Sequence, residues 1–147
     1  VGYRGLNQTR ALPGLTKDTT WQQGVTTTVR SLTAIAPDVL VLGDIPERTL
    51  PAPECLSTPG ADQATCLSPV GGEGIVANGF TVRGLEGTGA RYVDPRALVC
   101  SAGACPLVVG DQVVYYDDDH ITASWARLVA PALEELIGPL VTPRPGT

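Results

Sequence analysis

The sequence contains no methionine, a single histidine and few aromatic residues, and only 17% of its residues are charged. Its net charge is −5, and its ten basic residues form no run. Proteins that bind nucleic acid through phosphates need clustered lysine and arginine side chains. The composition therefore excludes nucleic acid as an expected partner.

Long apolar segments are also missing. No stretch of the chain approaches the length of about eighteen apolar residues that a membrane-spanning helix needs, and no secretory signal is present. The chain begins at Val1, so this absence says nothing about a parent protein. No Gly-x-Gly-x-x-Gly lies between a strand and a helix, and no nucleotide or other cofactor is expected.

What the sequence does contain is one compact motif around its only histidine, in residues 113–126. Asp117 precedes His120 by three residues, an apolar strand-like run leads in, and an amphipathic helix leads out. A carboxylate and an imidazole on such a loop can form the acid and base of a hydrolytic triad. Two other interpretations stay open from spacing alone. The loop could be a solvated acidic turn, or residues 117–119 could bind a cation through their carboxylates.

Several further motifs accompany this one in a fixed order, and the series covers most of the chain. Together they resemble SGNH hydrolase domains, and most closely the SGNH-like domains at the C-terminus of integral-membrane acyltransferases that O-acylate cell-envelope glycans. The motifs are Val39-Leu40-Val41-Leu42-Gly43-Asp44-Ile45-Pro46, Pro53-Glu54-Cys55-Leu56, Tyr92-Val93-Asp94-Pro95, Leu98-Val99-Cys100, Cys105-Pro106 and Tyr116-Asp117-Asp118-Asp119-His120-Ile121-Thr122.

The resemblance implies an α/β fold, three-layered and flavodoxin-like with a parallel sheet. Residues 1–140 would form the C-terminal portion of one such domain, and residues 141–147 a flexible tail. Asp117 and His120 map onto the acid and base of the triad. Asp118 and Asp119 are possible pocket residues beside them.

One part of the family pattern is missing, because SGNH domains begin with a Gly-Asp-Ser element that carries the nucleophile. Here Gly43-Asp44 is followed by Ile45, which has no nucleophilic atom, so the nucleophile is expected upstream or on a separate chain. Asp44 ends an aliphatic run, and ligands bind at the carboxyl ends of strands in open α/β sheets. Asp44 is therefore a possible pocket residue, although we slightly favour a turn or cap role for it. Asn7, in Gly5-Leu6-Asn7, is a weak candidate for donating to the oxyanion, and a surface turn explains it as well.

The four cysteines allow three pairings. We favour Cys55–Cys66 and Cys100–Cys105, because each closes a short local loop. The spacings match structural zinc sites poorly, so no metal is expected. Disulfides imply an oxidising compartment outside the cytoplasm.

Periodicity and turn residues predict the order of elements. Thr16 or Asp18 should cap the first helix, and Thr122 the last. The expected elements are a helix to about Ile35 with one apolar face (Trp21, Val25, Val29, Leu32, Ile35), a strand at 39–42, a long loop at 46–72, a weak broken helix at 73–89, a strand at 90–93, a hairpin at 107–116, and a helix ending at Gly138 with a buried face (Trp125, Leu128, Val129, Ala132, Leu133, Leu136, Ile137).

The resemblance implies an extracytoplasmic O-acyltransferase of the Ser-His-Asp type, acting on a cell-envelope glycan or glycolipid, with the nucleophilic serine outside this chain. The expected partners are the N-terminal part of the same domain, the membrane acyltransferase domain of the parent protein, and the acceptor. An absent N-terminal region would tether the domain to the membrane. The alternatives are a carbohydrate esterase, a non-catalytic glycan-binding accessory domain and a structural cation site.

Overall fold

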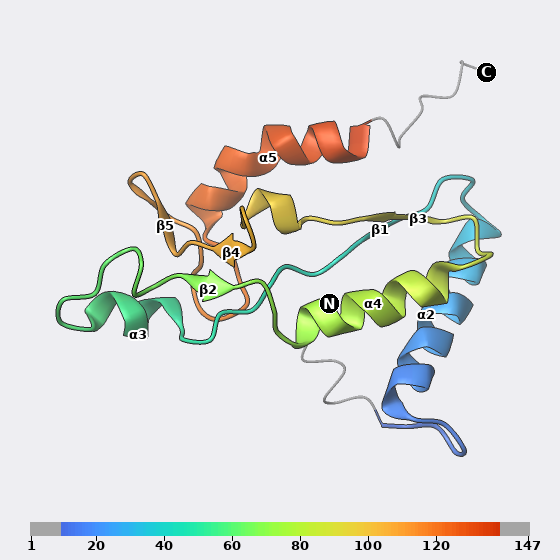
Figure 1. Cartoon of the computed structure of the whole chain (residues 1–147). Helices are drawn as coiled ribbons and strands as arrows, with labels where there is room; N and C mark the ends of the chain where they lie inside the picture. Colours follow the sequence, from blue (N-terminus) through green and yellow to red (C-terminus); the bar gives the residue numbers. More distant parts are fainter. Residues whose placement is uncertain (1–9, 139–147) are drawn as a thin grey trace.

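The computed structural model describes residues 10–138, and it confirms a mixed α/β chain (Figure 1). The expectations for Asn7 and for the tail at 141–147 lie outside the described residues. In chain order the elements are α2 (Lys17–Thr33), β1 (Leu40–Leu42), α3 (Ala52–Ser57), β2 (Ser68–Pro69), α4 (Glu73–Leu85), β3 (Arg91–Val93), the 3₁₀ helix η1 (Arg96–Leu98), β4 (Ala104–Cys105), β5 (Val108–Val109), β6 (Gln112–Val113) and α5 (Ala123–Ile137).

The centre of the fold is the parallel pair of β1 and β3, in which Leu42 lies opposite Val93. The pairing continues past the strands, because the backbone N–H of Gly43 donates to the carbonyl of Val93 at 2.9 Å. In Figure 1 this pair runs between α5 on one side and α2 with α4 on the other. The described residues therefore have the α/β organisation with a parallel strand pair that the sequence predicted.

The first helix begins where the sequence predicted, because the Thr16 side chain accepts from the Thr19 backbone N–H in a reciprocal capping box. It ends at Thr33, and its expected apolar face is only partly covered. Val29 is buried, whereas Leu32 is 43% exposed and Ile35 is 83% exposed. Much of that face is therefore open in the described chain.

Helices α2 and α4 pack closely against one another. The Trp21 indole donates to the Thr81 hydroxyl at 3.0 Å, and the Thr26 hydroxyl donates to the carbonyl of Gly84 at 2.7 Å. A Cβ on Gly84 would lie 2.8 Å from the carbonyl oxygen of Gln22. Glycine is thus required for this close approach, and Trp21 is a packing residue of the helix pair.

Two expectations between residues 46 and 89 were wrong. The predicted long loop contains α3 and β2. Pro51 stands at the start of α3, where proline is tolerated because the first backbone N–H groups of a helix have no intrahelical acceptor. The predicted broken helix is continuous from Glu73 to Leu85. Its glycines disfavour a helix by about 1 kcal/mol each, and close packing on α2 and on the end of β1 offsets this cost.

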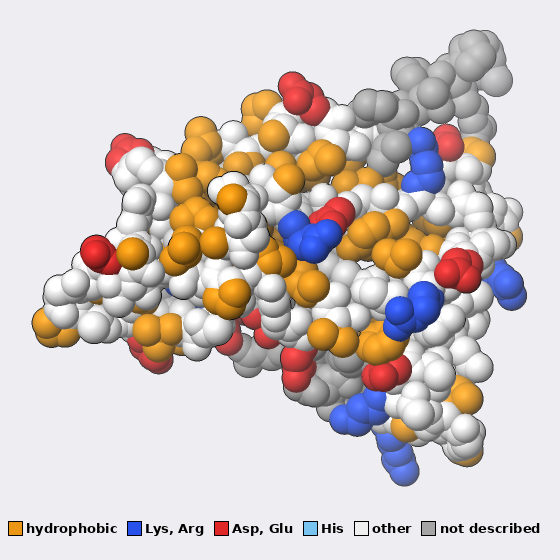
Figure 2. All heavy atoms as spheres, in the orientation of Figure 1, with side chains coloured by type: hydrophobic (Ala, Val, Ile, Leu, Met, Phe, Trp, Pro, Cys, Tyr) orange, Lys and Arg blue, Asp and Glu red, His pale blue; other side chains and the backbone are white. Residues whose placement is uncertain are grey.

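The largest core cluster lies beneath the histidine loop and around α5. Val114, Tyr115 and Leu107 are essentially inaccessible to solvent, and they pack with both disulfides and Trp125. Only Trp125 of the expected α5 face is fully buried. Leu128 is 57% exposed and Leu136 is 37% exposed, and apolar side chains reach the surface along α5 (Figure 2). The prediction of a fully buried face was therefore wrong for the described chain.

Both predicted disulfides are present, Cys55–Cys66 and Cys100–Cys105. They fit the oxidising, extracytoplasmic location that the sequence indicated. Within residues 10–138, no helix combines the length and the hydropathy that crossing a membrane requires.

Candidate active site

The histidine loop is a tight closed turn between β6 and α5. The backbone N–H of Tyr116 donates to the carbonyl of His120 at 2.7 Å, and the N–H of Thr122 donates to the carbonyl of Val114 at 2.9 Å. Inside the turn, Oδ1 of Asp117 accepts from the backbone N–H groups of Asp119 and His120, at 3.0 and 2.8 Å. The loop backbone thereby fixes the orientation of the Asp117 carboxylate.

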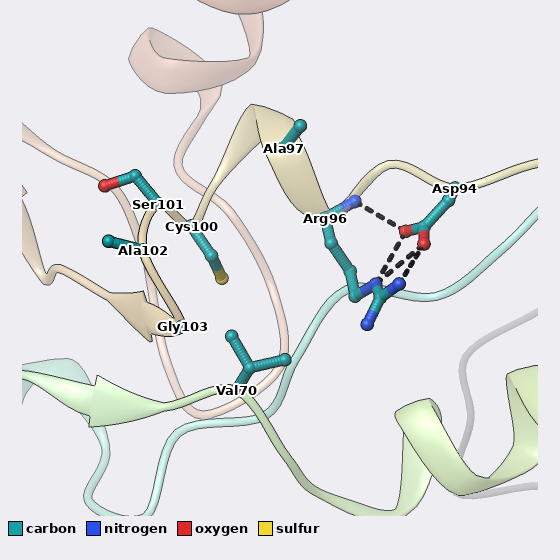
Figure 3. A pocket seen from close by; sticks show the side chains of 8 residues that line it. All are labelled: Val70, Asp94, Arg96, Ala97, Cys100, Ser101, Ala102 and Gly103. Atoms are coloured by element: carbon teal, nitrogen blue, oxygen red, sulfur yellow. Dashed lines mark hydrogen bonds and ion pairs between the residues drawn. The ribbon is translucent and has the colours of Figure 1, made fainter.

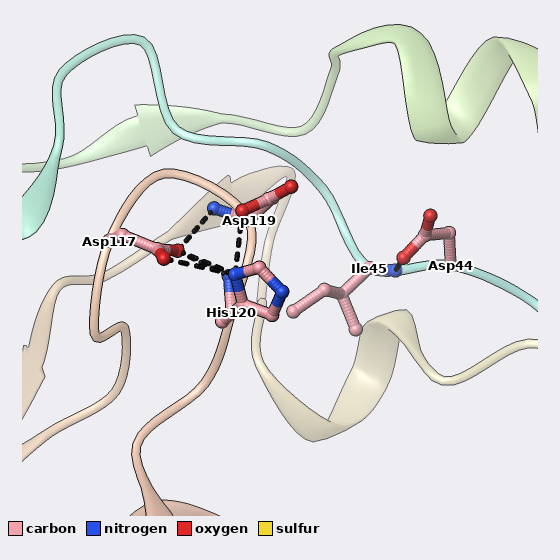
Figure 4. Close-up of polar contacts among 5 residues, drawn as sticks. All are labelled: Asp44, Ile45, Asp117, Asp119 and His120. Carbon is pink, nitrogen blue, oxygen red and sulfur yellow. Dashed lines mark hydrogen bonds and ion pairs between the residues drawn. The ribbon is translucent and has the colours of Figure 1, made fainter. Parts of the chain in front are cut away.

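This carboxylate lies against the imidazole of His120 (Figure 4). Nδ1 of His120 is 2.9 Å from Oδ2 of Asp117 and 2.8 Å from Oδ1 of Asp119. The other ring nitrogen points away from these carboxylates, toward the side where Ile45 and Asp44 lie. This is the arrangement in which a carboxylate orients an imidazole that acts as a base through its second nitrogen.

The carboxyl groups of the site differ in their electrostatics. Burial of Asp117 opposes ionisation, but hydrogen bonds from the N–H groups of Asp119 and His120, together with the imidazole, outweigh it and lower the pKa of Asp117. Burial raises the pKa of Asp119 against the attraction of His120, and repulsion from Asp118 adds to the rise. Burial also raises the pKa of Asp44. Asp117 is therefore the carboxyl group best suited to stay ionised beside an imidazolium.

The segment at 46–52 forms hydrogen bonds with the histidine loop and with Tyr115 before it. The backbone N–H of Arg48 donates to the carbonyl of Asp118 at 2.7 Å, and the Tyr115 hydroxyl donates to the carbonyl of Pro46 at 3.1 Å. Ala52 N–H adds a longer bond to the carbonyl of Asp117 at 3.4 Å. Sequence reasoning missed Arg48. Its only signal was a lone arginine within a Pro-rich, weakly charged segment.

A groove of about 1080 Å³ opens beside His120, between α2, β1 and α4. Its walls are mainly apolar and include Trp21, Val25 and Leu42, and Asp44 and His120 also line it. The structure thus brings two of the predicted site residues to one groove, although they are 76 positions apart (120 − 44).

The end of β1 that borders this groove is held rigidly. Oδ1 of Asn78 accepts from the backbone N–H of Asp44, and its Nδ2 donates to the carbonyl of the same residue, both at 2.8 Å. A Cβ on Gly43 would meet the Tyr92 hydroxyl at 2.0 Å, so no other residue fits there without movement of that side chain. Asn78 also lines the groove, and no motif in the sequence pointed to it.

A second pocket, of about 560 Å³, lies beside η1 and the turn at residues 101–103 (Figure 3). Nε of Arg96 lies 2.9 and 2.7 Å from the two oxygens of Asp94, so these charges largely satisfy each other. This pocket shares no lining residue with the groove beside His120. Ser101 and Asp94 line this pocket, but no histidine does, so it has no imidazole base.

Among the described residues, one group of side chains could ligate a metal ion. Ligand atoms of Asp117, Asp119 and His120 lie within 4.8 Å of one another, so this group could hold a cation. A metal bound through Nδ1 would displace the contact between the imidazole and Asp117. All four cysteines are in disulfides, which excludes thiolate ligation in the oxidised chain.

No serine is among the described residues that line the groove with His120. The hydroxyl of Ser31 donates to the carbonyl of Thr27, that of Ser57 to Glu54, and that of Ser124 pairs with Thr122. These are local helix and cap contacts, which agrees with the absence of a Gly-Asp-Ser element.

The comparisons with known proteins bear on the same features. No curated protein and no solved structure matches the chain significantly. The family model described as "SGNH domain (fused to AT3 domains)" matches residues 2–135, which include the end of β1, both disulfides and the histidine loop. The chain therefore belongs to the family of SGNH domains that are fused to AT3 domains.

Proposed function

We propose that this chain provides the acid and the base, but not the nucleophile, of an extracytoplasmic O-acyltransferase site. The observation that carries the proposal is the contact between Asp117 and Nδ1 of His120, with the other ring nitrogen directed away from the carboxylates. Membership of a family fused to AT3 domains makes a membrane acyltransferase domain the partner in the parent protein. A cell-envelope glycan or glycolipid is the proposed acceptor.

The chemistry follows from this pair. The carboxylate of Asp117 holds the proton on Nδ1, so Nε2 can accept the proton of a serine hydroxyl. The serine oxygen then bonds to the acyl carbon, and the carbonyl π electrons move to oxygen. Collapse of this intermediate breaks the bond to the leaving group, which takes the proton from His120. Transfer of the acyl group from the serine to a sugar hydroxyl completes O-acylation, and its transfer to water makes the same site an esterase.

Among the described residues one edge of β1 is unpaired, so a strand from another segment could add there and carry the nucleophile. Among the described residues β1 pairs only with β3, and backbone groups of a strand alternate between its two edges. Since Val39 and Gly43 bond to β3, the peptide groups of Leu40 and Leu42 face the other edge. A parallel strand added there would end beside Gly43 and Asp44, where His120 lines the groove.

A non-catalytic accessory domain is the second candidate. The specific observation in its favour is that no serine is among the described residues that line the groove. Such a domain would hold the glycan for the membrane acyltransferase without forming an acyl-enzyme. The Asp117–His120 pair would then have no chemical task, so loss of either side chain would leave acyl transfer intact.

The test compares hydrolysis of p-nitrophenyl acetate by the purified parent protein and its variants. His120→Ala and Asp117→Asn should each lower kcat about 10²–10⁴-fold, the usual contribution of a general base and its orienting carboxylate. Asp111→Asn is the matched control, because it changes an exposed acid in the hairpin turn. Wild-type kcat in His120→Ala would overturn the proposal and favour the accessory role.

A further inference from the structure

The pocket beside η1 contains an ion pair that is fixed in place but not enclosed. The backbone N–H of Arg96 donates to Oδ1 of Asp94 at 3.0 Å, and Nε and Nη2 of the same arginine contact the carboxylate (Figure 3). The Arg96 side chain is 46% exposed and that of Asp94 is 37% exposed. Both charged groups are therefore preorganised, and a ligand in solution can still reach them.

Each member of this pair keeps capacity for a further hydrogen bond. A guanidinium donates from all of its nitrogens, and Nη1 of Arg96 makes no hydrogen bond to the described residues. In Figure 3 this nitrogen points away from Asp94. A carboxylate has about four acceptor positions, and the backbone, Nε and Nη2 donors of Arg96 leave about one of them open. The pair can thus donate to one ligand oxygen and accept from a neighbouring hydroxyl.

The rest of the pocket lining is mainly small and apolar. It includes Val70, Ala97 and the loop at 100–103. A disulfide closes this loop, and the N–H of Val70 donates to the carbonyl of Gly103 at 3.2 Å. Small-molecule sites typically combine a preformed, mostly apolar cavity of about 300–1,000 Å³ with a few placed polar groups. The pocket, at about 560 Å³, has this construction.

These features match the chemistry of a neutral sugar ring. Adjacent sugar hydroxyls both donate and accept, so they can bind Arg96 and Asp94 together, while the C–H face of the ring packs on the apolar lining. Asp94 and Arg96 are the charged residues of the lining, and their charges offset one another. An anionic ligand would have to compete with Asp94 for the guanidinium. The pocket therefore favours a neutral polyhydroxylated ligand.

The pocket lies at the same end of the parallel strand pair as the groove. Asp94 directly follows Val93, whose carbonyl accepts from the N–H of Gly43, and Gly43 lines the groove together with His120. Tyr92 borders both places, because its hydroxyl lies where a Cβ of Gly43 would be. Burial raises the pKa of Tyr92, and the nearby charge of Asp94 adds to the rise. A glycan bound in the pocket could extend along this edge to the groove.

We propose that the pocket lined by Asp94, Arg96 and the loop at 100–103 binds a neutral sugar ring of the acceptor glycan. Asp94 and Arg96 are the residues that recognise its hydroxyls. The role as acceptor subsite rests on the proposed function, whereas binding of the sugar involves no proton transfer and no covalent bond. Such a subsite would select the glycan, because an acid–base pair alone does not distinguish one sugar hydroxyl from another.

Calorimetric titration of the parent protein with neutral trisaccharides tests this binding. The probes are maltotriose, cellotriose and the trisaccharide of N-acetylglucosamine. Arg96→Gln removes the guanidinium, and Asp94→Asn removes the charge but keeps an acceptor oxygen for the backbone N–H of Arg96. Both side chains are more than a third exposed, so neither substitution should unfold the chain. Arg30→Gln is the matched control, because Arg30 is exposed on α2 and lines neither the pocket nor the groove.

At least one trisaccharide should bind, and Arg96→Gln and Asp94→Asn should each raise its Kd about 10–100-fold, as loss of hydrogen bonds to a charged group does. The KM of the same sugar in acetyl transfer from p-nitrophenyl acetate should rise by a similar factor. Arg30→Gln should keep the wild-type values. The inference is wrong if none of the probes binds, or if the variants at 94 and 96 bind as tightly as Arg30→Gln.

Hydrolysis of p-nitrophenyl acetate by His120→Ala reports separately on the proposed function. If His120→Ala is inactive and the sugar binds equally well with and without Arg96, the inference fails and the proposed function stands. If His120→Ala keeps wild-type kcat, the proposed function and the acceptor role fail together. A raised Kd in Arg96→Gln would then still show that this pocket binds the sugar, as an accessory domain requires.

Discussion

The buried guanidinium of Arg48 lies over the ring of Tyr115, 5.3 Å from its centre. Arg48 is only 6% exposed, and its terminal nitrogens donate to the carbonyls of Cys66 and Cys105. The Arg48 side chain thus connects both disulfides with Tyr115, which directly precedes the histidine loop. Burial lowers the pKa of Arg48, and the carbonyls and the ring compensate its charge.

Replacement of Arg48 should destabilise the chain strongly. Arg48→Met leaves two buried carbonyls without donors, and each lost partner costs about 1–3 kcal/mol. We expect the free energy of unfolding in urea to fall by about 2–4 kcal/mol. Arg83→Met is the control, because Arg83 also stacks on an aromatic ring, Phe80 at 4.5 Å, but is exposed. Equal losses in the two variants would contradict a special role for Arg48.

The stability contributed by Asp44 should depend on pH in a defined direction. Burial raises the pKa of Asp44 above 3.8, so its ionised form is disfavoured in the folded state. Asp44→Asn should therefore be more stable than wild type above the folded pKa. The difference should shrink as the pH falls through that pKa and vanish below 3.8, where both states of wild type are protonated. Thermal unfolding across acid pH measures it, and a difference that grows toward low pH would have the wrong sign.

The neutral imidazole of His120 should carry its proton on Nδ1. Asp117 accepts from this nitrogen, and a carboxylate partner selects that tautomer. Because the chain has one histidine, ring nitrogen chemical shifts can be assigned to it without ambiguity. We expect the Nδ1–H tautomer in wild type and a mixture in Asp117→Asn. A neutral ring protonated on Nε2 in wild type would contradict the proposed base.

Calcium should leave the thermal midpoint unchanged. The carboxylates of Asp117 and Asp119 already contact Nδ1 of His120, so we assign them to the imidazole. A ligand that binds only the folded state raises its stability with concentration. Melting in EDTA and in increasing calcium therefore tests the cation interpretation. A midpoint that rises with calcium in wild type, but not in Asp119→Asn, would support a cation site.

The features that the sequence predicted correctly are local. The capped start of α2, both disulfides and the parallel strands follow from caps, short loops and aliphatic runs. The contact between Asp117 and His120 follows from a spacing of three residues within one turn.

The features that it missed depend on distant contacts. Asn78 bonds to a residue 34 positions away, and Arg48 to carbonyls 18 and 57 positions away. Neither has a local pattern that separates it from a solvent-exposed side chain. The continuity of α4 likewise depends on its packing against α2, which helix propensity does not contain.

Fluorophosphonate labelling of the parent protein, read by peptide mass, shows whether the nucleophile lies outside this chain and depends on His120. We predict an adduct on one serine outside these 147 residues, formed in wild type and strongly reduced in His120→Ala. An adduct on a serine of this chain (Ser31, Ser57, Ser68, Ser101 or Ser124), or labelling that does not depend on His120, would contradict it.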